Sequence, residues 1–210
     1  MYKNENYPSK VLQNAVEAIS SLPGVGSRSA LRFALHLLKQ DEGQILALSK
    51  AIASLSTDIH YCQQCNMISD EQTCSICADK RRDRNIICVV ESVRDVMSIE
   101  ATGQYKGVYH VLGGIISPIN GIAPSDLSIR QLMERMRAYG DSPVEVILAL
   151  SGDVEGETTS FYIYRQLSAL GLKELKVTTL ARGLGFGDDL EYADSLTLGR
   201  SILARQPFKA

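Results

Sequence analysis

Four cysteines set the strongest constraint on how this chain folds. Cys62, Cys65, Cys74 and Cys77 follow the pattern C-x2-C-x8-C-x2-C, which is typical of two knuckles that place four thiolates around one tetrahedral Zn²⁺. The intervening residues contain too few apolar side chains to build a core, so metal binding is expected to supply the folding energy of this segment. Four thiolates leave no open position for water, which predicts one structural zinc ion per chain.

Two disulfides would fit the same spacing, and the choice depends on the cellular compartment. Residues 1–10 are polar and contain Pro8, without the apolar stretch of a signal peptide, and no run approaches 18 consecutive apolar residues. We therefore expect a cytoplasmic protein, in which thiols stay reduced and a tight cluster of four is a metal site. The fifth cysteine, Cys88, lies in an apolar run and is expected to be a small buried hydrophobe.

The charge balance excludes a globally basic surface. The 210 residues include 22 Lys and Arg against 24 Asp and Glu, for a net charge of −2, and 45% are hydrophobic, as in ordinary globular proteins. Residues 1–84 carry 10 basic and 9 acidic side chains, whereas residues 85–210 carry 12 and 15. Any nucleic-acid site must therefore be local, and the N-terminal part is favoured.

Apolar periodicity predicts three helices before the cysteines. They cover residues 9–22 with Ser9 as the N-cap, a segment from a capping Ser27 to Leu38, and a segment that includes Ile45 and Leu55. Between the first two, the string Leu-Pro-Gly-Val-Gly ending at residue 26 breaks the helical pattern.

This glycine-containing turn predicts a helix-hairpin-helix motif that binds DNA. Gly24 and Gly26 let a backbone approach the start of the second helix, where unpaired amides and the helix dipole favour an anion. Arg28 and Arg32 are four residues apart, so they project from nearly the same face and can bracket phosphates without reading bases. The alternative is a tight turn in which the glycines adopt positive φ and the arginines are solvated.

From residue 85 the pattern predicts an α/β domain with a parallel sheet. Apolar runs indicate strands at 86–90, 108–112, 144–150 and 175–180, which alternate with helices at 92–101, 127–139 and 157–170. A final helix is expected at 190–205. In such a fold the binding groups gather at the carboxyl ends of the strands.

An acidic cluster is expected at those carboxyl ends. It consists of Glu91 after the first strand and Asp153, Glu155 and Glu157 after the third. These carboxylates are suited to hold Mg²⁺, and the alternative is a solvated acidic loop. The basic run 80–84 just before the sheet either supports DNA binding or is a solvated linker.

The acidic arrangement resembles the Toprim domain, in which a glutamate and an Asp-x-Asp pair bind a catalytic metal. Ser151 stands at the first aspartate of that pair, and Asp153 matches the second. Together with the hairpin, the cysteine box and the terminal string Gly-Asp-Asp-Leu-Glu-Tyr-Ala-Asp at 187–194, the chain resembles the RecR family of bacterial recombination mediators over essentially its whole length. It departs from that family at 151–153, where Asn-Pro-Thr is usual, and at 182–186, where Ser-Gly-Leu-Pro-Val is more common.

The resemblance implies four regions and a function. They are a helix-hairpin-helix region (1–57), a four-cysteine zinc finger (58–84), a Toprim-like domain (85–182) and a C-terminal glycine-rich loop with a helix (183–210). It further implies a non-enzymatic DNA-binding protein, assembled as a ring-like homotetramer through the N-terminal helices and the C-terminal segment. Such a protein works with RecO and RecF to load RecA on gapped single-stranded DNA, and binds single- and double-stranded DNA without sequence preference.

A second function remains open from the residues alone. A small Toprim-type nuclease or RNA maturase would use the four carboxylates Glu91, Asp153, Glu155 and Glu157 for metal-assisted phosphodiester cleavage. Ser151 argues against it. A nucleotide hydrolase is disfavoured because no G-x-x-x-x-G-K-[ST] string occurs in the sequence.

Overall fold

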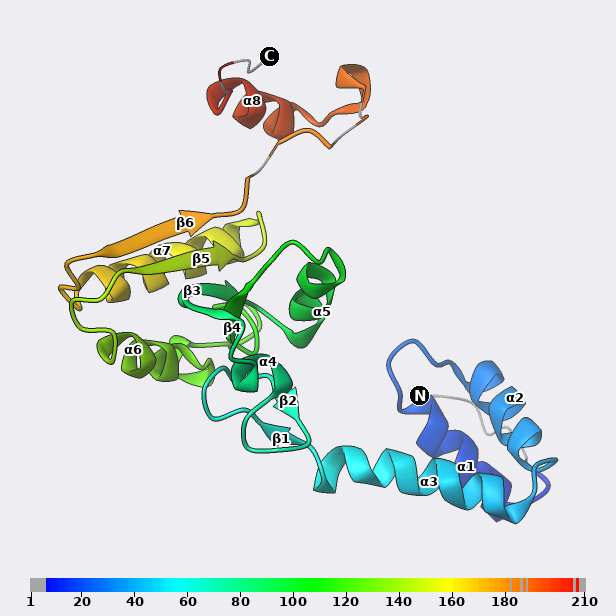
Figure 1. The fold of residues 1–210 in the computed structure, drawn as a ribbon. Helices are drawn as coiled ribbons and strands as arrows, with labels where there is room; N and C mark the ends of the chain where they lie inside the picture. Colours follow the sequence, from blue (N-terminus) through cyan, green and yellow to red (C-terminus); the bar gives the residue numbers. More distant parts are fainter. Residues whose placement is uncertain (1–6, 182, 186, 188, 206, 208–210) are drawn as a thin grey trace. The chain divides into compact units, whose positions relative to one another are not determined.

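The computed structural model describes residues 7–181, 183–185, 187, 189–205 and 207. The chain divides into two compact units, Met1–Ile59 and His60–Ala210 (Figure 1). The expected boundary at residue 182 and parts of the expected C-terminal region lie outside the described residues. Within the described ranges, no helix is both long and apolar enough to cross a membrane.

The first unit contains the three predicted helices, α1 (Lys10–Ser20), α2 (Ser27–Leu37) and α3 (Glu42–Thr57). Helices α1 and α2 pack through a small core of Val16, Ala30 and Ala34. The prediction that Ser27 caps α2 is wrong by one residue. Gly26 holds the extended N-cap conformation, with φ −79° and ψ 164°, and Ser27 is already helical.

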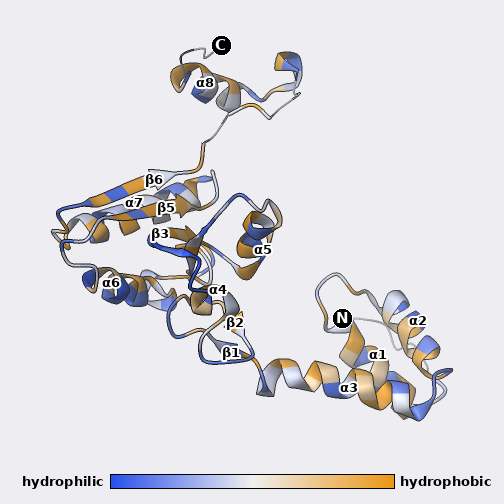
Figure 2. Ribbon diagram, in the orientation of Figure 1, coloured by the Kyte–Doolittle hydropathy of each residue, from blue (hydrophilic) through white to orange (hydrophobic). Residues whose placement is uncertain are grey.

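Helix α3 contributes no buried residue to this unit. Asp41 caps it by accepting a hydrogen bond from the amide of Gln44, which explains its sharp start. Its apolar side chains, including Ile52 (60% exposed) and Leu55 (63% exposed), face solvent, and Figure 2 shows apolar residues along its length. One copy of the chain therefore leaves an apolar helix surface uncovered.

The second unit is built on a four-stranded parallel sheet. Its strands are β3 (Asp83–Val90), β4 (Gly107–Val111), β5 (Val144–Ala149) and β6 (Leu175–Thr179), in the order β4-β3-β5-β6. The register places Val90 beside both Val111 and Ala149. The carboxyl ends of β3, β4 and β5 consequently lie at one edge of the sheet, as predicted for an α/β fold.

Helices cover both faces of the sheet because the central strand is apolar on both sides. Ile87 and Val89 of β3 point to the face that is covered by α6 (Ile129–Arg137) and α7 (Val154–Ser168). Cys88 and Val90 point to the opposite face, where α5 (Val93–Ala101) packs. The expectation that Cys88 is a buried hydrophobe is confirmed at 2% exposure, and burial raises the pKa of its thiol to about 12.

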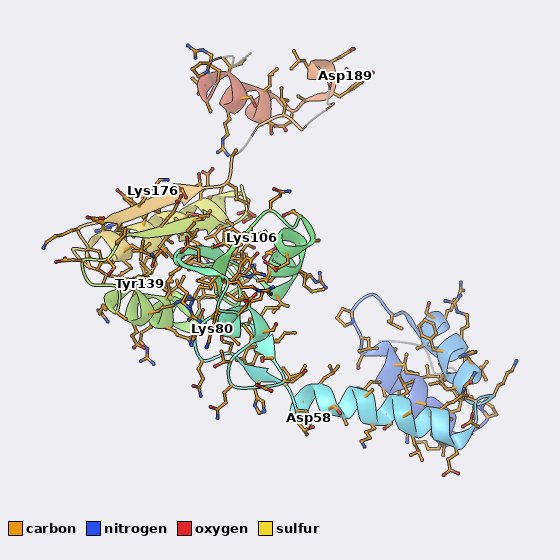
Figure 3. All side chains as sticks on the ribbon, in the orientation of Figure 1. Asp58, Lys80, Lys106, Tyr139, Lys176 and Asp189 are labelled. Carbon is orange, nitrogen blue, oxygen red and sulfur yellow. The ribbon has the colours of Figure 1, made fainter. Side chains whose placement is uncertain are left out.

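The cysteine segment belongs to this second unit. It comprises β1 (His60–Tyr61) and β2 (Ile68–Ser69), which pair antiparallel, and the short helix α4 (Ser75–Ala78). Met67 and Ile76 pack against the cysteine cluster and also against the apolar residues beneath α5. Figure 3 shows the side chains crowded between this segment and the sheet, with Tyr139, whose hydroxyl donates to the carbonyl of Arg84, at the edge of α6.

Two predicted helices differ from the observed ones by three or more residues at their N-termini. Helix α7 begins at Val154 and not at 157, because Asp153 accepts a hydrogen bond from the amide of Gly156 and caps it. The expected helix at 190–205 is divided into a 3₁₀ turn η2 (Leu190–Tyr192) and helix α8 (Ser195–Leu203). Asp194 caps α8 through the amide of Thr197, so it stops the helix from extending backwards.

Candidate metal centre and nucleic-acid interface

The four cysteines converge on one point, as the spacing predicts. All are buried, and their Sγ atoms lie within 4.8 Å of one another. The Sγ atoms of Cys65 and Cys74 are 3.5 Å apart, close to the roughly 3.8 Å edge of a tetrahedron with sulfurs about 2.3 Å from one ion. Among the described residues, this is the one such group of His, Cys, Asp and Glu side chains. Thiolate donors in this geometry fit zinc, which confirms the predicted structural site.

Backbone amides help to hold the thiolates in place. The amide of Cys74 donates to Sγ of Cys62 and the amide of Cys77 donates to Sγ of Cys74, both at 3.4 Å. The hydrogen bond with Cys65 lowers the pKa of the Cys74 thiol to about 2, and the same contact raises the pKa of Cys65. Close packing of these sulfurs therefore favours a thiolate at Cys74 and disfavours one at Cys65, and binding of a metal requires both in the thiolate form.

The first knuckle is joined to the edge strand β4 of the sheet. The amide of Val111 donates to the carbonyl of Cys65 at 2.8 Å, and Nδ2 of Asn66 donates to the carbonyl of Val111 at 3.0 Å. Arg135 of α6 donates to the carbonyls of Gln64 and Tyr109. The metal centre thus fixes the edge of the sheet.

The hairpin has the geometry expected of an anion-binding helix start. Gly24 has φ +78°, and the amide of Val25 donates to the carbonyl of Leu22, which closes the turn. Gly26 is the N-cap and carries no side chain, unlike Asp41 of α3 and Asp153 of α7, which bond the first-turn amides of their helices. Among the described residues, no side chain at the N-cap bonds the first amides of α2.

The two predicted arginines extend from that helix start. Arg28 and Arg32 are both exposed on α2, and Arg32 lies over the ring of Phe33, 5.4 Å from its centroid. They line one groove together with Lys39, a residue that the hairpin motif did not single out. Its spacing of eleven residues from Arg28 is the signal that would have identified it.

The three arginines of the basic run 80–84 have partners within the protein. Arg81 forms an ion pair with Asp79, and Arg84 donates to the carbonyl of Cys77 at 2.8 Å. Arg82 binds Glu100 through two hydrogen bonds, which raises the pKa of Arg82 and lowers the pKa of Glu100. Arg82 and Arg84 therefore connect the cysteine segment to the sheet and to α5, whereas the pair of Arg81 and Asp79 is local.

The acidic residues lie at the predicted edge of the sheet, but each has a different partner. Glu91 accepts a hydrogen bond from the amide of Ser151, which joins the ends of β3 and β5. Asp153 accepts from the hydroxyl of Ser151 as well as capping α7. Glu155 accepts from the hydroxyl of Ser117 at 2.6 Å, and Glu157 forms an ion pair of 2.9 Å with Arg200 of α8.

A loop after β4 completes this region, and sequence reasoning did not identify it. Ser117 is 1% exposed and its hydroxyl also accepts from the side chain of Asn120. The amide of Ile116 donates to the hydroxyl of Thr159 in α7, which is fully buried. The loop is therefore fastened to the start of α7 by buried hydroxyl groups, which stabilise the position of Glu155.

Comparisons with known proteins match the regions in order. Residues 12–55 match the helix-hairpin-helix family of RecR, 59–79 match the four-cysteine zinc finger domain of RecR, 85–181 match the Toprim domain and 183–206 match the C-terminal family of RecR. The recombination protein RecR of Bacteroides thetaiotaomicron is 51% identical over 205 residues, which cover 98% of each chain. That of Flavobacterium johnsoniae is 52% identical over 97% of this chain and 96% of its own.

A third relative, the recombination protein RecR of Porphyromonas gingivalis, is 48% identical over 97% of this chain and 96% of its own length. These similarities extend across the hairpin, the buried cysteine cluster and the parallel sheet described above, and not across one part alone. The chain belongs to the RecR family of recombination proteins.

Proposed function

We propose that this RecR-family protein acts in recombinational DNA repair by holding the DNA backbone at the hairpin while it docks a partner protein elsewhere. The observation that carries the proposal is the glycine-capped start of α2, beside which Arg28 and Arg32 are exposed. Main-chain amides and guanidinium groups bind phosphate oxygens and carry no information about base sequence. The expected activity is therefore DNA binding without sequence preference.

Zinc supports this function without taking part in chemistry. Cys62, Cys65, Cys74 and Cys77 would hold the ion with all four coordination positions filled, so it supplies folding energy. The chain's own contacts from Cys65 and Asn66 to β4 then keep the cysteine segment and the sheet in one unit.

The Toprim domain is proposed to be a docking surface and not a catalytic site. Ser151 occupies the position of the first metal-binding aspartate, and the carboxylate of Glu91 is bonded to the amide of Ser151. The carboxylate of Asp153 is the helix cap of α7. Carboxylates that serve as structural acceptors lose part of their capacity to bind Mg²⁺, although they still present negative charge to a basic partner.

RecO and RecF are the proposed partners, and loading of RecA on gapped single-stranded DNA is the proposed outcome. A ring-like homotetramer would present several hairpins to one DNA molecule, so that a protomer with a net charge of −2 still binds through summed contacts. The exposed apolar side chains of α3, including Ile52 and Leu55, support an assembly that covers them.

The DNA-binding proposal is tested by the double variant Arg28→Ala with Arg32→Ala. Its affinity for two unrelated DNA sequences is expected to fall equally, and its dependence on salt to flatten. The control is Arg130→Ala with Arg137→Ala, which removes two exposed arginines from α6. If the hairpin variant bound DNA like the wild type, DNA would have to be removed from this site.

The absence of catalysis is tested separately with labelled DNA and RNA in the presence of Mg²⁺ or Mn²⁺. No cleavage is expected from the wild-type protein. Metal-dependent cutting that is abolished by Glu91→Ala would instead establish a nuclease that uses the carboxylates Glu91, Asp153, Glu155 and Glu157.

A further inference from the structure

A groove of about 410 Å³ runs along helix α2 and continues beyond its last turn. It is lined by Arg28, Leu31, Arg32, Leu35, His36 and Lys39. All of these residues come from one continuous stretch of chain, so the groove exists within a single protomer. It begins at the hairpin and extends away from it.

The spacing of the cationic residues explains why they line the same groove. Arg28, Arg32 and Lys39 stand at positions i, i+4 and i+11, which lie on one face of a helix. This face is opposite to Ala30 and Ala34, which are buried against α1. Lys39 lies two residues beyond the end of α2. Its amide still donates to the carbonyl of His36, so the helical turn continues to Lys39.

The charged residues that line the groove are all cationic. No Asp or Glu occurs between residues 18 and 40 of the sequence, and none lines the groove. The nearest acidic residue beyond its end, Asp41, uses its carboxylate to cap α3. Leu31 and Leu35 lie between the cations and offer no hydrogen-bonding side chain that could distinguish one base from another.

We propose that the DNA backbone leaves the hairpin along this groove and that Lys39 is a third phosphate contact in each protomer. Eleven residues of helix rise about 16 Å, which corresponds to roughly five nucleotides at about 3.4 Å per nucleotide of one strand. The inference rests on the proposed DNA binding of the hairpin and adds the direction and length of the bound strand.

The test is the salt dependence of DNA binding by Lys39→Gln in the full-length protein. Loss of one phosphate contact is expected to make the slope of log K against log salt shallower by about 0.9 for each engaged protomer on duplex DNA and by about 0.7 for each on single strands. Lys39→Arg, which retains the charge, is expected to keep the wild-type slope. Lys50→Gln removes the same charge from the exposed surface of α3, outside the groove, and is also expected to keep it.

Three results would overturn the inference. If Lys39→Gln and Lys50→Gln reduced the slope of log K against log salt equally, only the net charge of the protein would matter. An unchanged slope for Lys39→Gln, with binding lost in the Arg28→Ala and Arg32→Ala variant, would leave the hairpin proposal standing without the groove. A changed assembly state with an unchanged slope, measured by native mass, would show that a second copy of the chain occupies the groove. Failure of the hairpin proposal itself is recognised differently, because the double arginine variant would then bind normally.

Discussion

The carbonyl of Cys65 accepts a 2.8 Å hydrogen bond from the amide of Val111, so a zinc ligand pairs directly with the edge strand of the sheet. Strand β4 is terminal in the order β4-β3-β5-β6, and an uncovered edge is prone to pair with other chains. The knuckle of the metal site covers the carboxyl end of this edge. Folding of the cysteine segment and protection of the sheet are therefore coupled.

Removal of zinc is expected to loosen β4 before the rest of the sheet. A chelator should release about one zinc per chain, as expected for one site with four ligands. The cysteine segment would then lose the folding free energy that metal binding supplies. Hydrogen exchange at Val111 is expected to accelerate, because its acceptor on Cys65 is no longer held. The amides of β6, at the other edge, serve as the internal control and should change little.

Asn66 is expected to stabilise the junction in two ways. Its φ of +60° is unfavourable for most residues, and its side chain donates to the carbonyl of Val111. Asn66→Ala should lower the free energy of unfolding by about 2 to 3 kcal/mol through strain and the lost hydrogen bond. Asn66→Gly should cost about 1 kcal/mol less than that, because glycine adopts positive φ freely. Urea denaturation measures both, and equal costs for the two variants would show that the backbone conformation is unstrained.

Buried His110 is expected to make stability depend on pH. Burial lowers its pKa from 6.5 to about 4, and the ring bonds Ser128 through Nε2 while Nδ1 has no hydrogen-bond partner among the described residues. In the unfolded chain His110 is therefore protonated below about pH 6.5, whereas in the folded chain it stays neutral down to about pH 4. Stability is full above pH 6.5 and should fall by about 3 kcal/mol as the pH drops through this window.

The matched variants for this prediction are His110→Gln and His60→Gln, since His60 is exposed. Denaturant unfolding is measured at intervals between pH 7 and pH 4. In the His110 variant the free energy of unfolding should depend less steeply on pH, by roughly 1.4 kcal/mol per pH unit, which corresponds to the uptake of one proton. The His60 variant should keep the slope of the wild type. The same slope in both variants would mean that His110 is protonated in the folded state.

The ion pair between Arg82 and Glu100 is expected to stabilise the start of β3. Their side chains are 16% and 30% exposed, and Glu100 also accepts from the hydroxyl of Tyr109 at 2.7 Å. Arg82 lowers the pKa of Glu100. The ion pair therefore contributes fully to folding stability above the ordinary pKa of glutamate, and this stability is lost as the pH falls through the lowered pKa of Glu100.

Glu100→Gln should lower the free energy of unfolding at pH 7 by roughly 1 to 3 kcal/mol, between the values for exposed and buried pairs. Glu134→Gln is the control, because the pair of Arg130 and Glu134 is 3.6 Å apart and largely exposed. It should change stability by less than about 0.5 kcal/mol. Thermal unfolding at pH 7 and pH 3 measures both variants, and the difference from wild type should shrink in acid only at position 100.

Features that depend on local patterns could be predicted from the sequence. The zinc ligands follow from the spacing of four cysteines, and the strands follow from apolar runs such as residues 86–90, since a strand covered on both faces must be apolar throughout. The predicted start of α7 at residue 157 is wrong because Asp153, interpreted as a member of the acidic cluster, is the N-cap of this helix.

Features that depend on distant backbone atoms could not be predicted. The bond from Val111 to Cys65 joins two main-chain groups, which every residue other than proline carries, so no side-chain pattern marks it. The partners of the acidic residues are similar: Ser117 lies 38 residues before Glu155, and Arg200 lies in α8. The sequence placed these carboxylates at one edge of the sheet but did not indicate which groups they bind.

The most direct test of the central claim is DNA binding by the wild-type protein over a range of salt concentrations, alone and with RecO. We predict binding at low ionic strength to unrelated sequences with equal affinity, and a linear fall of log K with log salt as phosphate contacts are displaced by ions. Failure to bind DNA at low ionic strength in every state of assembly, with and without RecO, would contradict the account.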